Sequence, residues 1–238
     1  MTVEPLGARA RSLPADAGSS PTVRTRDAAS IMLLDRSGKD VRVLMGKRHS
    51  AHVFMPDLYV FPGGRRDPGD HGLGFSGDLH PAVLRSLRSG EGRTITETRA
   101  RALALAAARE LYEEAGVALG RAHERPGAAL PFLPDLTNLR YMARAITPPG
   151  LPMRFDTRFF AVFTEEAGID PSRVLESQEL QDLQWIDVND FSSLRVPEIT
   201  AIILSDLRNG LESDPSLPPE RTVPFYFTRH GRFHRTLL

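Results

Sequence analysis

Three carboxylates are concentrated in one short segment, residues 109–117, which reads Arg-Glu-Leu-Tyr-Glu-Glu-Ala-Gly-Val. At about 100° per residue, Glu110, Glu113 and Glu114 share one narrow face of a helix. Acidic groups near a helix C-terminus oppose the helix dipole, and like charges three or four residues apart repel. A hard divalent cation with oxygen ligands, Mg²⁺ or Mn²⁺, relieves this repulsion. Taken alone, the same spacing is more commonly a solvated acidic face.

A tight turn at residues 62–66, Pro-Gly-Gly-Arg-Arg, offers a second set of groups. Carbonyls around Gly64 are candidate metal ligands, and the guanidinium groups of Arg65 and Arg66 suit phosphate oxygens. Solvated surface arginines are an equally good interpretation of this pair. The next acid, Asp70, has two equal interpretations: it caps a local structure through hydrogen bonds, or it is solvated.

These groups need a scaffold, and the pattern of the chain predicts a mixed sheet with packed helices. Residues 94–97, Thr-Ile-Thr-Glu, fit a capping box and Gly116 fits the end of one long helix. A second helix is expected from Pro197 to Arg208, with Gly210 behind it, and a short one over 81–88. Strands are expected over 28–34, 41–45, 58–61, 139–146, 155–163, 183–186 and 223–227.

Composition excludes several classes of protein. Thirty basic and thirty acidic residues give no net charge, so neither nucleic acid nor an anionic membrane is an expected partner. Cysteine is absent, which excludes disulfides, thiolate metal sites and a cysteine nucleophile. No apolar run is long enough for a membrane span, and a cytoplasmic location is the default expectation. We expect residues 1–26 to form a poorly ordered leader and residues 27–238 to form one domain.

Gly64, Asp70 and the segment 109–117 together resemble the Nudix box. That motif reads Gly, five residues, Glu, seven residues, Arg-Glu-apolar-x-Glu-Glu-x-Gly-apolar, and its second half matches at every defined position. Two features depart from it. Asp70 stands where the family has Glu, and 38 residues (71 to 108) separate it from Arg109 in place of seven, an excess of 31.

The split box resembles the subgroup that contains the mammalian coenzyme A diphosphatase. Residues 48–49, 54–56, 61–64 and 156–160, with Trp185, carry this likeness. The resemblance implies an α/β/α sandwich with a long insertion, about 71–94, and hydrolysis of coenzyme A or acyl-CoA to 3′,5′-ADP and a 4′-phosphopantetheine. Related enzymes often form homodimers, which makes a homodimer an expectation here too.

The resemblance also implies roles for individual residues. Glu110, Glu113 and Glu114, with the Gly64 carbonyl, are the expected metal ligands, and Arg109 is expected to pair with Glu113 inside the catalytic set. Substrate contacts by Arg65 and Arg66 are expected from their guanidinium chemistry and not from the resemblance, and solvated surface arginines stay the alternative.

Two questions stay open at the level of sequence. The general base is either Glu114 or an acid on a later loop, for which Glu176, Glu179 and Asp182 are candidates and Glu179 is preferred. The substrate alternatives are ADP-ribose or NADH, and a non-catalytic nucleotide sensor on the same fold is a third interpretation.

Overall fold

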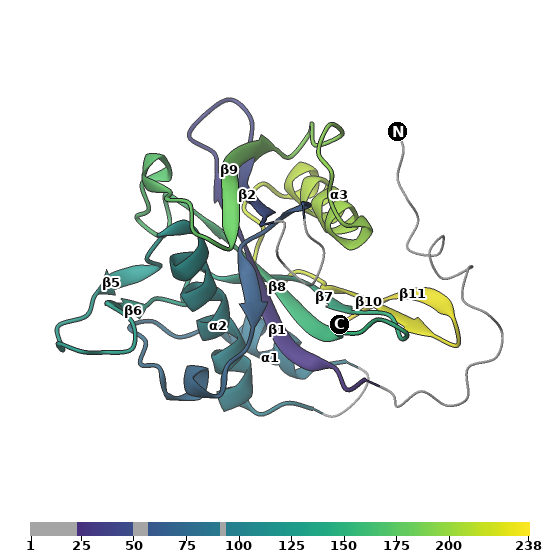
Figure 1. Cartoon of the computed structure of the whole chain (residues 1–238), viewed down its shortest axis with the longest axis horizontal. Helices are drawn as coiled ribbons and strands as arrows, with labels where there is room; N and C mark the ends of the chain where they lie inside the picture. Colours follow the sequence, from purple (N-terminus) through teal and green to yellow (C-terminus); the bar gives the residue numbers. More distant parts are fainter. Residues whose placement is uncertain (1–22, 50–56, 91–93) are drawn as a thin grey trace.

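A mixed nine-stranded sheet forms the centre of the computed structural model, which describes residues 23–49, 57–90 and 94–238. Its main path runs β11-β10-β7-β8-β1-β2-β3, while β4 pairs with β1 and β9 with β2 (Figure 1). The long central strands β1 (Arg26–Asp35) and β8 (Phe155–Phe163) run parallel, because the chain crosses over between them. Both are buried over most of their length, as apolar central strands require.

The remaining strands extend this centre on both sides. They are β2 (Arg42–Arg48), β3 (Tyr59–Val60), β4 (Gly63–Arg65), β7 (Arg140–Ile146), β9 (Leu180–Asp187), β10 (Pro224–Arg229) and β11 (Arg232–Leu237). A separate two-stranded ribbon consists of β5 (Gly120–Ala122) and β6 (Phe132–Pro134). Short 3-10 turns, η2 (Pro68–Gly72) and η3 (Pro171–Arg173), lie in the connections.

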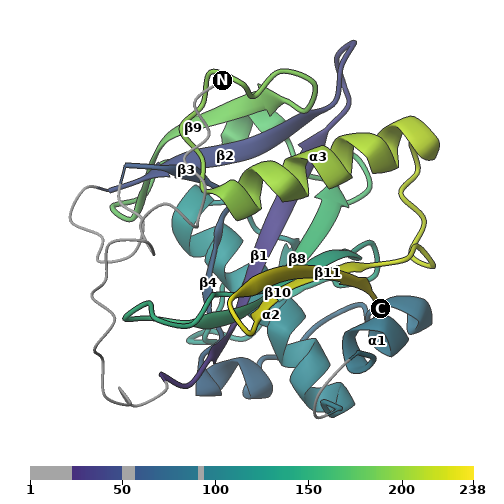
Figure 2. The ribbon, with the colours of Figure 1, turned by 90° about the vertical axis from the view of Figure 1, so that its right-hand side faces the viewer.

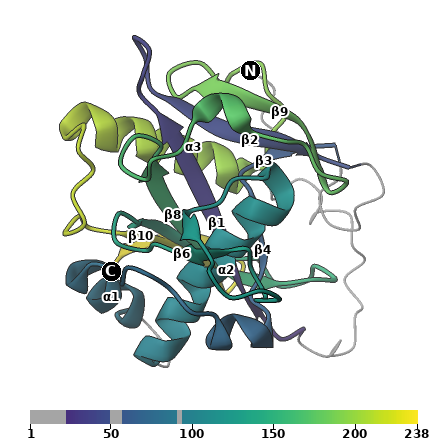
Figure 3. The same cartoon turned by 90° about the vertical axis from the view of Figure 1, so that its left-hand side faces the viewer.

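Helices cover both faces of the sheet, which gives three layers. The long helix α2 (Glu97–Ala115) and the short α1 (Pro81–Arg88) lie on one face, and α3 (Glu198–Ser213) crosses the other (Figures 2 and 3). Each face has its own apolar core, one built on the alanines of α2 and one on the leucines and isoleucines of α3. The α/β fold with a mixed sheet and flanking helices therefore agrees with the expectation from sequence.

The helix ends differ in detail from the sequence-based expectation. Thr96, not Thr94, caps α2, and its side chain accepts a hydrogen bond from the Arg99 N–H at 3.2 Å. Gly116 ends the helix as expected, with φ at 69° in the left-handed region where glycine is favoured. Gly210 lies inside α3, which continues to Ser213, because the glycine leaves room for other side chains to pack against the helix.

The C-terminal hairpin is a feature that the sequence pattern did not predict. β10 and β11 pair across a turn in which His230 (φ 51°) and Gly231 (φ 71°) both take left-handed conformations. The expected strand over 223–227 is therefore the first half of a hairpin, and β11 forms the edge of the sheet.

The segment between η2 and α2 packs at a distance from the box residues. Its helix α1 lies against α2 and β7, and the ion pairs Asp78–Arg101 and Arg88–Glu97 tie the segment to the first turns of α2. The expected leader falls mostly on residues 1–22, and the Phe54-Met55-Pro56 string falls on 50–56; both ranges lie outside the described residues. Within the described ranges, no helix is long and apolar enough to cross a membrane.

Candidate active site

The Pro-Gly-Gly turn is pinned to the central strand β1. The Ser30 hydroxyl donates to the Pro62 carbonyl at 2.9 Å, and the Ile31 N–H donates to the same oxygen at 2.9 Å. Gly63 and Gly64 then run antiparallel to β1 as part of β4. A Cβ on Gly63 would lie 2.6 Å from the Ala29 carbonyl oxygen, so this close approach requires glycine.

The turn faces the C-terminal end of α2 and its carboxylates. The Gly63 N–H donates to Glu114 Oε2 at 2.7 Å, and a Cβ on Gly64 would lie 2.5 Å from Glu110 Oε1. Both glutamates are buried, Glu110 at 9% and Glu114 at 7% relative exposure, whereas Glu113 is exposed. The two glycines therefore allow the backbone of β4 to reach two buried carboxylates.

Burial dominates the electrostatics of this pair. Desolvation raises the pKa of Glu110 to about 7, against the attraction of Arg109. Desolvation likewise raises the pKa of Glu114 to about 8, although the Gly63 N–H stabilises the charged form; Glu110 and Glu179 raise it further. Perturbed carboxylates of this kind gather at functional sites.

Arg109 connects the acidic face to the η2 turn. Its guanidinium donates to Glu110 Oε1 and Glu113 Oε2, both at 2.8 Å, and to Asp70 at 2.8 and 3.2 Å. A further bond at 3.1 Å reaches the Arg65 carbonyl. Asp70, 2% exposed, also accepts from the Asp67 N–H at 2.7 Å. In this conformation Asp70 is therefore the hydrogen-bonding cap and not a solvated acid.

A cavity of about 340 Å³ opens at these residues. Glu110, Glu114 and Glu179 contribute to its wall, together with Arg48 and Arg65. Of the three loop acids considered, Glu179 is the one in the wall. Asp182 accepts instead from the Tyr59 hydroxyl, and Glu176 is exposed outside the lining. The structure therefore brings Glu179 to the box carboxylates, and its role as a base stays a prediction.

The two arginines after the turn point in different directions. Arg65 is exposed and belongs to the cavity wall, where it also pairs with Asp67 at 3.0 Å. Arg66 donates to Asp27 at 3.2 Å and does not line the cavity. Arg65 therefore lines the cavity and Arg66 does not, and a substrate contact by either arginine stays a prediction.

The donor set at this end of the cavity suits a divalent cation. Glu110 and Glu114 are two oxygen donors whose negative charge is poorly solvated, and Gly64 leaves the adjacent space without a side chain. Among the described residues, no three acidic or imidazole groups are arranged as a finished metal site. Arg109 donates to Glu110 and the Gly63 N–H donates to Glu114. The carboxylates fit a metal, while their present bonds are to the protein.

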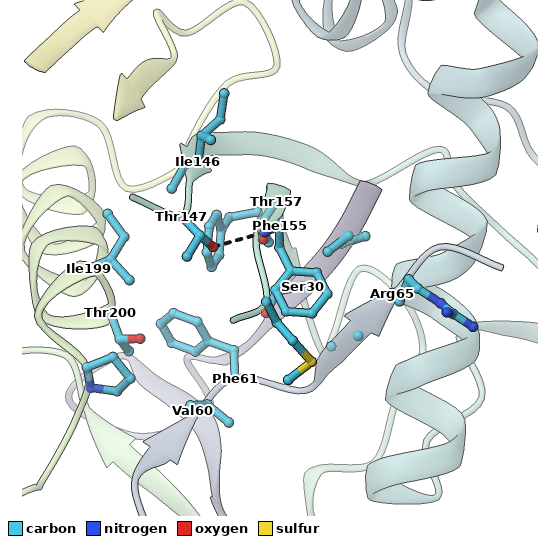
Figure 4. Close-up of a pocket in the computed structure, with 18 of the residues that line it drawn as sticks. Ser30, Val60, Phe61, Arg65, Ile146, Thr147, Phe155, Thr157, Ile199 and Thr200 are labelled. Atoms are coloured by element: carbon cyan, nitrogen blue, oxygen red, sulfur yellow. Dashed lines mark hydrogen bonds between the residues drawn. The ribbon is translucent and has the colours of Figure 1, made fainter. Parts of the chain in front are cut away.

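Much of the cavity wall consists of residues that sequence reasoning missed. The β7–β8 connection, the first turn of α3 and the C-terminal hairpin supply mostly apolar side chains (Figure 4). Tyr226 was expected to pack in a closing strand, and it does so while also lining the cavity. No local signal marks these positions, because they come from three distant segments.

Comparison with known proteins finds one curated relative and several solved structures that resemble this chain. No family model matches the chain. The chain is 29% identical over 182 residues to "Putative nudix hydrolase 7" of Caenorhabditis elegans. The matched region covers 68% of this chain and 51% of that protein. The chain thus spans about half the length of this relative.

Solved structures extend the comparison. A NUDIX hydrolase from Alicyclobacillus acidocaldarius has a TM-score of 0.57 and 26% identity, covering 77% of this chain and 90% of that one. A MutT/nudix family protein from Enterococcus faecalis is 13% identical with a TM-score of 0.50, and the match covers 89% of this chain and 69% of that one. It shares the fold. In sequence and in fold the chain is therefore similar to Nudix hydrolases, and the residues that resemble the Nudix box meet at one turn of this fold.

Proposed function

We propose that the chain hydrolyses the diphosphate linkage of a nucleotide derivative with a divalent cation, and that coenzyme A or an acyl-CoA is the substrate. The observation that carries the hydrolase proposal is the pair of buried carboxylates, Glu110 and Glu114, in one cavity wall with Glu179. Burying two acids beside each other is costly unless a cation offsets their charge. The coenzyme A assignment rests on the subgroup resemblance of the sequence.

Glu110, Glu113 and Glu114, with the Gly64 carbonyl, would hold the cation. A bound Mg²⁺ or Mn²⁺ supplies neutralisation of the diphosphate and a lower pKa for an attacking water. The protein supplies orientation: Arg109 fixes Glu110 and Glu113, and the Gly63 N–H fixes Glu114.

The remaining steps use groups at the cavity mouth. Glu179 takes a proton from the attacking water. The oxygen of that water bonds to phosphorus, and the bridging phosphorus–oxygen bond of the diphosphate breaks. Arg65 offers its planar guanidinium to phosphate oxygens. The products from coenzyme A are 3′,5′-ADP and 4′-phosphopantetheine.

A substrate panel tests this proposal. Purified protein is incubated with coenzyme A, acyl-CoAs, ADP-ribose, NADH and dinucleoside polyphosphates, with Mg²⁺, Mn²⁺ or EDTA, and products are identified by mass spectrometry. Coenzyme A turnover that EDTA abolishes supports the proposal. Turnover confined to ADP-ribose or NADH would refute the coenzyme A assignment. No turnover of any compound would favour the nucleotide sensor.

Variants connect activity to the named carboxylates. Glu110→Gln and Glu114→Gln should each lose turnover by at least about 100-fold. Glu124→Gln is the matched control, since Glu124 is 93% exposed beside Arg121 and does not line the cavity. Titration with Mn²⁺, followed by water-proton relaxation, gives a readout of metal binding that is independent of turnover.

A further inference from the structure

The cavity has two chemically different parts. Its charged lining residues are the five at the box end: Arg48, Arg65, Glu110, Glu114 and Glu179. The rest of the described lining is uncharged, and part of it, including Phe61, Phe159 and Tyr226, belongs to the core on the α3 face. In Figure 4, Ile146, Thr147, Ile199 and Thr200 lie on one side of the cavity, whereas Arg65 lies on the other with its guanidinium directed away.

Most hydroxyl groups in the uncharged part are already engaged by the protein. Ser30 donates to the Pro62 carbonyl, Thr147 accepts from the Phe155 N–H at 3.0 Å, and the Tyr226 hydroxyl donates to Asp206. Thr157 and Thr200 are the two other side-chain hydroxyls in the described lining. This part of the cavity therefore offers a ligand extensive apolar contact and few hydrogen bonds.

That lining disfavours a nucleotide. A phosphorylated ribose would lose its hydration in a space whose described lining has no cation beyond the box end. A nucleobase and a ribose also carry many donors and acceptors, and each one left unpaired lowers affinity by roughly five- to hundredfold.

The size of the cavity limits it to a portion of the substrate. About 340 Å³ is at the small end of the range for sites that hold drug-sized ligands, roughly 300–1,000 Å³. A molecule as large as coenzyme A would place one arm inside and leave the other outside.

We propose that the uncharged part of the cavity binds the hydrocarbon-rich, non-nucleotide arm of the substrate, and that the nucleotide half stays outside near Arg65. The inference rests on the proposed function, in which the diphosphate lies at Glu110 and Glu114. For coenzyme A, the arm inside is pantetheine with its acyl group. The polar phosphates of 3′,5′-ADP then face solvent and the exposed Arg65.

Met153 gives a direct readout of occupancy, because its side chain lines the cavity. Protein labelled with ¹³C at its methionine methyl groups is titrated with octanoyl-pantetheine or with 3′,5′-ADP, and Met153→Leu assigns the signal. Octanoyl-pantetheine should shift the Met153 resonance, and 3′,5′-ADP should leave it unchanged. A shift with 3′,5′-ADP alone, or with neither compound, overturns the proposal.

Filling the cavity provides a second test. Thr200→Phe, and separately Met153→Phe, should weaken octanoyl-pantetheine binding about tenfold or more and change 3′,5′-ADP binding less than twofold. The matched control is Thr222→Phe, at an exposed position outside the lining. Thermal unfolding shows which variants are folded. If one of the two filling variants does not fold, the other still provides the test. Selective loss of 3′,5′-ADP binding would reverse the assignment.

Neither measurement requires turnover, so the two proposals fail separately. A Met153 response to octanoyl-pantetheine in a protein that does not hydrolyse coenzyme A supports the cavity assignment and refutes the proposed reaction. Hydrolysis of coenzyme A without a Met153 response to octanoyl-pantetheine supports the proposed reaction and refutes the cavity assignment.

Discussion

Replacing Asp70 tests whether it supports the box across the long gap in sequence. Asp70→Ala removes both hydrogen bonds to Arg109, at 2.8 and 3.2 Å, and the bond from the Asp67 N–H at 2.7 Å. Asp70 is 2% exposed and the Arg109 side chain 13%, so little solvent replaces the lost partner. The variant should therefore be destabilised and should also lose activity, because Arg109 orients Glu110.

The expected magnitude follows from the burial of the pair. Removing one partner of a buried ion pair costs about 3–5 kcal/mol. Arg109 keeps two glutamates, of which Glu113 is half-exposed, so the low end of that range applies, about 3 kcal/mol. For a domain of this size, that corresponds to a fall in Tm of roughly 6–12 °C.

Urea unfolding of the metal-free protein measures the difference, with three companion variants. Asp70→Glu keeps the charge and should cost less than about 1 kcal/mol, while Asp70→Asn keeps the shape and isolates the charge. Asp40→Ala, in the exposed β1–β2 turn, should change stability by no more than about 0.5 kcal/mol. An Asp70→Ala protein as stable as Asp40→Ala would refute the reasoning, and an Asp70→Asn protein as stable as wild type would limit Asp70 to a neutral cap.

Three further changes have defined outcomes. Glu114→Gln should abolish turnover yet unfold at the same or higher urea concentration, because an amide is cheaper to bury than the crowded carboxylate. Gly64→Ala should weaken Mn²⁺ binding at least about tenfold, since its methyl would meet a carboxylate at 2.5 Å, whereas Gly38→Ala, with open space around it, should not. Burial opposes the charged form of Asp27, but Arg99 and its other arginine partners lower its pKa below 3.8. Its contribution to the free energy of unfolding is therefore complete above about pH 4 and lost as the pH falls further, and Asp27→Asn should remove that acid slope in urea titrations.

Sequence reasoning succeeded where the signals were local. The capping threonine, alanine-rich centre and terminal glycine of α2 lie within one helix, so the helix and its acidic face could be located before the structure. The error of two residues at its start arose because Thr94 and Thr96 offer the same chemistry, and only the backbone selects one. Gly210 was misjudged since its packing partners, around Leu217 and Arg221, come from a later segment.

The cavity was not predictable in the same way. Its uncharged wall joins the β7–β8 connection, the first turn of α3 and the C-terminal hairpin to β3, and no residue pattern in these segments places them beside one another. The hairpin itself was missed because His230-Gly231 is a weak turn signal beside polar strands. Contacts between distant segments are set by how the layers pack, and that information is absent from any single window of sequence.

The interval between Asp70 and Arg109 shows which property of the box has to be preserved. In the sequence the interval is 38 residues (71 to 108), yet the two side chains are joined at 2.8 Å. The intervening chain leaves after η2, packs as α1 beside the start of α2, and enters α2 at Glu97, from which the helix runs on to Arg109. The entropy cost of closing a loop grows only logarithmically with its length, and the ion pairs Asp78–Arg101 and Arg88–Glu97 anchor this segment to the first turns of α2. The contact between Asp70 and Arg109 therefore forms across a long interval of chain, and the Asp70→Ala variant tests whether the chemistry requires that contact.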